Sequence, residues 1–222
     1  MAPPPSSTKR RQQRALARDT GKRQQNVSLH FVGLARNFFK RIGLPFRIVP
    51  SYESDPKDVF FKGCWLDRGT LVFCPGRVQV GELMHEAGHL ALTPKDQWHL
   101  LEPGSLTTSP PLGDFALIGD AAVEAWDYAA ALAADVPILT IFRHGFDGNG
   151  LQVWEQFDHQ MHPGFALLRF LGMSNRWGTC DRWLVGKASV EQTKETFEHL
   201  MKSCTFDERK LIIKAFEARL KC

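Results

Sequence analysis

The segment Gly81-Glu82-Leu83-Met84-His85-Glu86-Ala87-Gly88-His89-Leu90-Ala91-Leu92 decides how the rest of the chain is interpreted. Its alanines and leucines recur at helical spacing and Pro94 follows it, so it predicts a helix that ends there. Residues four apart on a helix lie one above the other, which lets His85 and His89 turn their rings toward a single ion. Because the segment is too apolar for a surface helix, we favour this interpretation over two histidines on an exposed helix face.

The same pattern, His-Glu-x-x-His, places Glu86 in the turn that carries His85 but at a different angle. Two neutral imidazoles hold Zn²⁺ and leave it Lewis acidic, and the metal lowers the pKa of a water to ~7. A carboxylate within hydrogen-bond reach can then take the proton of that water. We therefore expect a zinc site with His85 and His89 as ligands and Glu86 as the catalytic base.

Composition limits the class of protein. The 222 residues are 43% hydrophobic, which is enough for one substantial core. No run approaches the ~18 consecutive apolar residues of a membrane span, and no apolar stretch follows the basic N-terminus as in a secretory signal. The five cysteines are an odd, widely spaced set without a C-x-x-C pair, which favours free thiols in a reducing compartment. We expect a cytoplasmic protein that makes no membrane contact.

Residues 1–26 differ from the rest of the chain. They are rich in Pro, Ser, Gln and Arg and nearly free of large apolar side chains, so we expect a disordered tail. Seven basic residues against Asp19 give this tail a net charge of +6, which leaves −2 for the body out of the total of +4. Residues 9–23 could make a weak nucleic-acid contact, but no aromatic residue is interleaved for base stacking. We favour a solubilising tail.

Between the tail and the histidine helix, the pattern predicts one helix and three strands. Apolar residues at three- and four-residue steps predict a helix over 27–42. Strand character follows in three segments, 46–49, 63–66 and 70–74, and Gly69 closes a turn between the last two. The expected fold class is therefore α+β, with a small sheet laid against the histidine helix.

A catalytic zinc site needs a third protein ligand, and a later helix offers two acids. After residues 93–117, which predict a long loop, an alanine-rich helix covers 119–132 with Asp120 as its N-cap. This helix is apolar on most faces, so an unpaired glutamate would be costly there, and metal coordination would resolve that cost for Glu124. Asp127 either ligates instead or accepts the outer N–H of a metal-bound imidazole. An exposed acidic strip is the alternative for both acids.

Two parts of the chain together resemble the ImmA/IrrE-type zinc metallopeptidases. Residues 69–93 are similar to that family's His-Glu-x-x-His region, and the later pattern is Glu124-Ala125-x-x-Tyr128-Ala129-Ala130-x-Leu132 with Pro137 after it. The resemblance covers about residues 30–137. It implies a zincin-like fold, a regulatory protease with a protein or peptide substrate, and a zinc site whose parts are the ligands His85, His89 and Glu124 and the base Glu86.

The C-terminal part offers weaker signals. A zinc peptidase needs a hydrogen-bond donor for the oxyanion, commonly His or Tyr, and the candidates are His159, His162 and Tyr128. For all three we favour the structural explanation: core packing for Tyr128, and a surface or hydrogen-bonded core position for each histidine. Two amphipathic segments with capping-box spacing predict a helical hairpin over about 189–221. We expect it to pack onto one domain that spans 27–222.

These patterns predict a zinc-dependent metallopeptidase that hydrolyses peptide bonds. Two alternatives stay open. The first is a non-catalytic zincin-fold module for sensing or scaffolding in a DNA-associated complex. An absence of bound metal would favour this alternative. The second is a metal-dependent hydrolase with a substrate other than a peptide. An open sheet edge beside the metal would favour a peptide, since an extended substrate can add as a strand.

Overall fold

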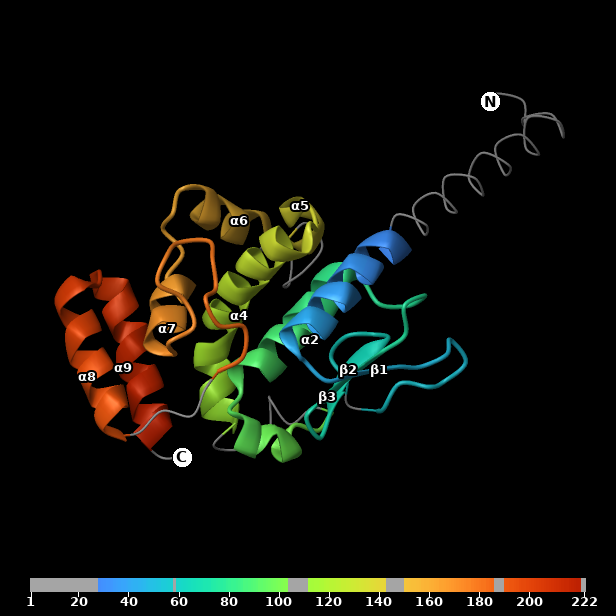
Figure 1. Cartoon of the computed structure of the whole chain (residues 1–222), viewed down its shortest axis with the longest axis horizontal. Coiled ribbons are helices and arrows are strands. Elements are labelled where there is room, and N and C mark those ends of the chain that lie inside the picture. Colours follow the sequence, from blue (N-terminus) through green and yellow to red (C-terminus); the bar gives the residue numbers. More distant parts are fainter. Residues whose placement is uncertain (1–27, 58, 104–111, 143–149, 186–189, 221–222) are drawn as a thin grey trace, which may run out of the picture.

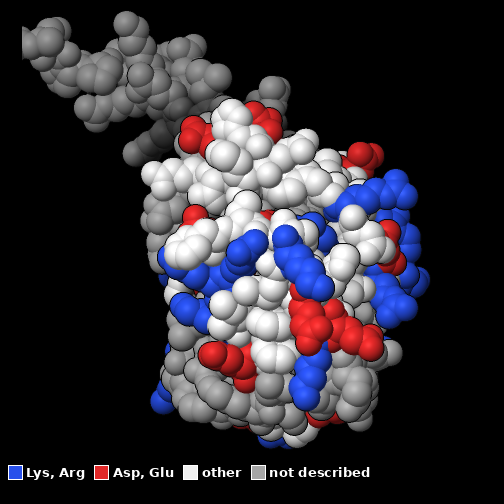
Figure 2. All heavy atoms as spheres, turned by 90° about the vertical axis from the view of Figure 1, so that its left-hand side faces the viewer, with Lys and Arg blue, Asp and Glu red and all other residues white. Residues whose placement is uncertain are grey.

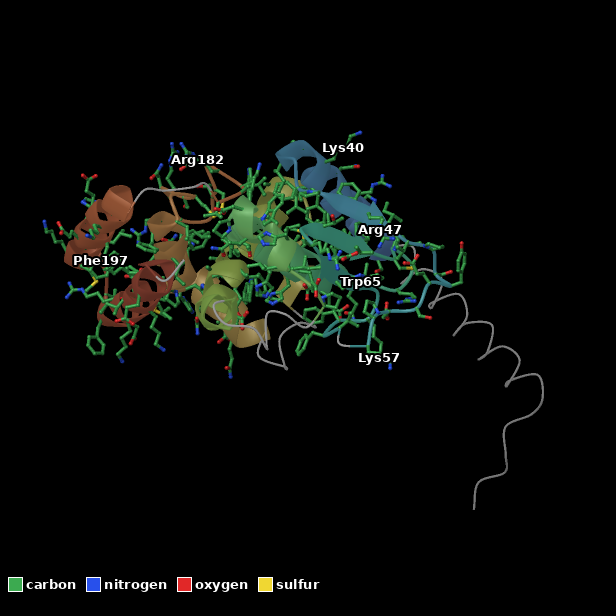
Figure 3. The ribbon with its side chains drawn as sticks, turned by 90° about the horizontal axis from the view of Figure 1, so that it is seen from below. Lys40, Arg47, Lys57, Trp65, Arg182 and Phe197 are labelled. Atoms are coloured by element: carbon green, nitrogen blue, oxygen red, sulfur yellow. The ribbon has the colours of Figure 1, made fainter. Side chains whose placement is uncertain are left out.

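The computed structural model describes residues 28–57, 59–103, 112–142, 150–185 and 190–220, and Figure 1 shows their arrangement. The tail over 1–26, with its predicted disorder and nucleic-acid contact, lies outside these residues. The small sheet and a C-terminal helical hairpin lie at opposite ends, with helices α2 (Val80–Leu92) and α4 (Leu112–Ala134) between them. Figure 3 shows the same order from below, with Trp65 in the sheet and Phe197 on the hairpin.

Three short strands form one mixed sheet, which contacts α2 through β2 and β3. They are β1 (Phe46–Ile48), β2 (Cys64–Asp67) and β3 (Thr70–Phe73), in the order β1-β3-β2. β1 runs parallel to β3, and β2 runs antiparallel to it. The turn between β2 and β3 has positive φ at Arg68 (46°) and Gly69 (81°), as a two-residue hairpin turn of the primed type requires. The predicted strands are confirmed, as is the first helix, which covers 28–42.

Helix α2 carries the histidine pair and is buried on nearly every face. It begins after Gln79, whose backbone N–H donates to the Glu82 carboxylate at 3.2 Å. It ends at Leu92 because Thr93 is extended before Pro94. α2 contacts the sheet on one side and α4 on another (Figure 1). The predicted apolar helix is therefore confirmed, and the alternative of an exposed one is wrong.

Helix α4 is longer than the sequence predicts. The expected loop over 93–117 is wrong at both ends, because Lys95–Leu100 forms a 3₁₀ helix and α4 already begins at Leu112. Asp120 consequently lies inside α4 and not at its N-cap. Gly113 and Gly119 lower the local helix propensity by about 1 kcal/mol each, which conceals the first two turns in the sequence.

The remaining helices build the C-terminal part: α5 (Ile138–Phe142), α6 (Gly150–Asp158), α7 (Gly164–Phe170), α8 (Val190–Ser203) and α9 (Phe206–Leu220). α8 and α9 form the predicted hairpin, in which Phe197 and Phe216 stack with centroids 4.2 Å apart. Basic and acidic side chains are interspersed over the face at this end (Figure 2). The fold class is mixed α+β, as predicted. Among the described helices, none has the length and apolar character needed to cross a membrane.

Candidate metal centre

One turn of α2 brings His85 and His89 together. Their Nε2 atoms lie 3.1 Å apart, and the two rings are perpendicular with centroids 4.6 Å apart. Burial lowers the pKa of both imidazoles, that of His89 well below its usual value. Both rings are therefore neutral near pH 7, the state in which an imidazole nitrogen can donate a lone pair to a cation.

The far side of the His85 ring faces Asp127 on α4. Oδ2 of Asp127 lies 3.5 Å from Nδ1 of His85, and the aspartate is 0% exposed. A carboxylate behind the ring favours the tautomer with the proton on Nδ1, which leaves the Nε2 lone pair on the side of His89. Asp127 thus lies behind the imidazole rather than among the atoms that both histidines face.

Gly88 allows α2 and α4 to approach this closely. A Cβ atom at Gly88 would lie 2.7 Å from Cγ1 of Val123 and 3.3 Å from Oδ1 of Asp127, so the first contact would be far shorter than a van der Waals contact. From the segment that precedes β2, the ring of Phe61 meets the His85 ring at 90° with centroids 5.8 Å apart. The His85 ring is therefore held between Asp127 of α4 and Phe61, and these two contacts set its orientation.

Three acids of α4 follow one another at helical spacing, so that Asp120, Glu124 and Asp127 share one face. Oδ1 of Asp120 lies 3.5 Å from Nε2 of His89, and the Asp120 side chain is 66% exposed. In the described part of the chain, His85, His89 and Asp120 form the one group of three potential ligands whose donor atoms all lie within 4.8 Å of one another. Glu124, the predicted third ligand, is not brought into this group.

Glu124 pairs instead with His162, whose Nε2 lies 2.9 Å from Oε2 of the carboxylate. The backbone N–H of Gly164 donates to Nδ1 of the same ring at 3.2 Å. Nδ1 is therefore the acceptor, and Nε2 carries the proton that it donates to Glu124. Because both ring nitrogens are engaged, His162 would have to leave Glu124 before it could donate to an oxyanion, the role predicted for it.

Tyr128 and His159, the other predicted oxyanion donors, have different surroundings. The Tyr128 ring stacks on Phe157 with centroids 4.6 Å apart and an interplanar angle of 17°. His159 is exposed, and its backbone N–H donates to the carbonyl of Glu155 at the end of α6. Tyr128 thus has a packing role, and His159 lies at the surface. Their roles as oxyanion donors stay predictions.

Glu86 lies next to His85 and is buried. Burial raises its pKa to about 7; the charge of His85 acts to lower the pKa, while the charges of Asp120 and Asp127 raise it further. The Glu86 carboxyl is thus coupled electrostatically to His85, Asp120 and Asp127. A carboxyl whose pKa is near neutral can both accept and release a proton near pH 7, as a general base must.

Asp120 is the residue that the sequence did not indicate as a ligand, because its assignment as an N-cap removed it from the helix. The spacing of three acids at i, i+4 and i+7 was the signal that could have found it. Comparison with known proteins adds no further residue: no protein-family model, no curated protein and no solved structure matches the chain.

Proposed function

We propose that the protein is a zinc-dependent metallopeptidase with a zincin-like site similar to that of the ImmA/IrrE-type family. The observation that carries the proposal is the buried pair of imidazole Nε2 atoms 3.1 Å apart, with the Asp120 carboxylate 3.5 Å from one of them. Two neutral imidazoles and one carboxylate are a donor set typical of catalytic zinc. The pattern His-Glu-x-x-His supplies a base beside that donor set.

The surroundings of the pair fit a divalent cation. Burial, together with the negative charges of Glu124 and Asp120, raises the pKa of Asp127 well above its usual value. A cation between the histidines would offset the repulsion among these acids. His85 and His89 would hold the ion with one acid of α4. That acid is Asp120 as the side chains are placed, or Glu124, one turn further on, as the family resemblance implies.

A bound zinc ion supplies Lewis acidity, which lowers the pKa of water and polarises a substrate carbonyl. Glu86 takes a proton from the attacking water as the water oxygen bonds to the carbonyl carbon. Glu86 then delivers this proton to the leaving nitrogen as the C–N bond breaks. Its pKa of about 7 suits both transfers. Asp127 keeps the His85 ring in one orientation throughout.

Replacement of Glu86 by Gln tests the proposal, because glutamine has nearly the same size and cannot accept the proton. We expect Glu86→Gln to retain zinc and to hydrolyse casein and a quenched fluorescent peptide library about 10²–10⁴-fold more slowly. Glu82→Gln, on the first turn of the same helix, is the matched control and keeps the wild-type rate. Hydrolysis by Glu86→Gln at the wild-type rate would contradict the mechanism. A zinc-loaded wild type that cleaves none of these substrates would favour the non-catalytic alternative.

A further inference from the structure

The hydrogen bond between His162 and Glu124 has no role in the chemistry described above. It joins side chains 38 positions apart in the sequence, with 2.9 Å between Nε2 and Oε2. His162 is 3% exposed and lies in the corner between α6 and α7. A buried imidazole has to satisfy both of its nitrogens, and this one does so with Glu124 on one side and the Gly164 N–H on the other.

The corner that carries His162 is fixed against α4 on both sides of Glu124. A Cβ atom at Gly164 would lie 1.8 Å from the carbonyl oxygen of Ala121 and 2.8 Å from Cβ of Ala125, so only glycine permits this approach. The His162 ring also stacks on Phe157, with centroids 4.0 Å apart and an interplanar angle of 27°. The close approach at Gly164 and the stacking on Phe157 therefore hold the Nε2–H group of His162 toward Glu124.

We infer that His162 is a positioning residue that holds the Glu124 carboxylate beside the metal centre, an inference that rests on the proposed zinc site. Glu124 lies one turn from Asp120, and its charge acts on His85. With Oε2 held by an N–H donor, the side chain loses rotational freedom, and Oε1 together with the carboxylate charge stays available to a cation. Groups that orient a ligating carboxylate in this way strengthen metal binding.

The zinc affinity of the full chain, measured by competition with a chromophoric chelator, tests this role. His162→Phe keeps a ring that can stack on Phe157 but removes the donor, whereas His162→Gln carries an amide N–H at about the position of Nε2. Both variants remove the acceptor of the Gly164 N–H, and only His162→Gln also loses the stacking on Phe157. A smaller loss of affinity in His162→Gln can therefore be assigned to the retained N–H donor. We expect the Kd for zinc to rise about 10–100-fold in His162→Phe and to stay near the wild-type value in His162→Gln. His159→Phe, an exposed position in the same corner, leaves Kd unchanged.

A double-mutant cycle separates this role from a general effect on folding. If His162 acts through Glu124, then His162→Phe weakens zinc binding no further in a Glu124→Ala background. His162→Leu is a second variant without the donor, so the result does not depend on one substitution.

If the wild type binds zinc, the proposed function stands, and three outcomes would still overturn the inference about His162. They are unchanged affinity in His162→Phe and His162→Leu, equal losses in His162→Phe and His162→Gln, and an undiminished loss in the Glu124→Ala background. Failure of the wild type to bind zinc at all would overturn the proposed function and this inference with it.

Discussion

Replacement of Asp127 by Asn is expected to weaken zinc binding without weakening the metal-free fold. Asp127 is 0% exposed, and its Oδ2 lies 3.5 Å from Nδ1 of His85. Asparagine fills the same volume beside Gly88 but brings no negative charge behind the imidazole. A neutral partner makes His85 a weaker donor to a cation and holds its tautomer less firmly.

The magnitude follows from the position of the carboxylate behind His85. Loss of such a partner weakens metal binding by about 10–100-fold, which corresponds to about 1.4–2.7 kcal/mol. With zinc in excess, the zinc-dependent gain in the free energy of unfolding falls by the same amount. For a chain of this size, the Tm of the zinc-bound variant then lies about 3–11 °C below that of the zinc-bound wild type. Without zinc, the Tm of the variant equals or exceeds that of the wild type, because an amide has no charge to desolvate.

Two measurements check this prediction: chelator competition for the Kd, and calorimetric melts with and without zinc for the Tm. The informative feature is that the zinc-bound Tm falls while the metal-free Tm does not. A variant that binds zinc as tightly as the wild type would refute the assignment of Asp127 as the partner of His85. A variant whose metal-free Tm falls by as much as its zinc-bound Tm would show that Asp127 only supports the fold.

Three further outcomes are expected. Gly88→Ala places a Cβ 2.7 Å from a methyl group of Val123 on α4 and should lower the free energy of unfolding by about 1–2 kcal/mol. In the control Gly33→Ala, nothing lies within 4 Å of the new Cβ, and the free energy of unfolding should rise by roughly 0.5–1 kcal/mol. Equal gains for the two variants in urea melts would refute the close approach of α2 and α4. If Asp120 is the acidic ligand, Asp120→Ala should lower the zinc content at a fixed chelator concentration more than Glu124→Ala does, and the reverse order would assign the ligand to Glu124. Partial burial, followed by the charge of Asp181, raises the pKa of Cys180 to about 12. Its thiol therefore stays protonated at pH 8, and iodoacetamide should label it slowly until the pH approaches that value. Labelling at pH 8 as fast as in a short peptide, read by mass spectrometry, would contradict this environment of the thiol.

The parts of the site that the sequence predicts correctly are those set by local geometry. His85 and His89 meet because helical residues four apart always lie on one face, and burial of α2 follows from its apolar composition. The β2–β3 turn is equally local, since Gly69 permits the positive φ that the turn requires.

The parts that the sequence leaves open depend on contacts between distant segments. Asp120 lies beside His89 because α4 packs against α2. The sequence conceals this position because Gly113 and Gly119 are weak helix formers, so the helix is expected to begin later. The partner of Glu124 is His162, 38 positions away, in a corner whose path over α4 is set by Gly164. No local pattern encodes that path, so the sequence alone cannot distinguish an oxyanion donor from a residue that orients a carboxylate.

The zinc content of the purified wild type, compared with those of His85→Ala and His89→Ala, tests the central claim most directly. Because each histidine supplies one of two adjacent Nε2 atoms, we expect about one zinc per wild-type chain and little in either variant after dialysis against a weak chelator. Elemental analysis by mass spectrometry gives the number. A wild type without zinc, or histidine variants that retain it at the wild-type level, would contradict a shared cation at this pair.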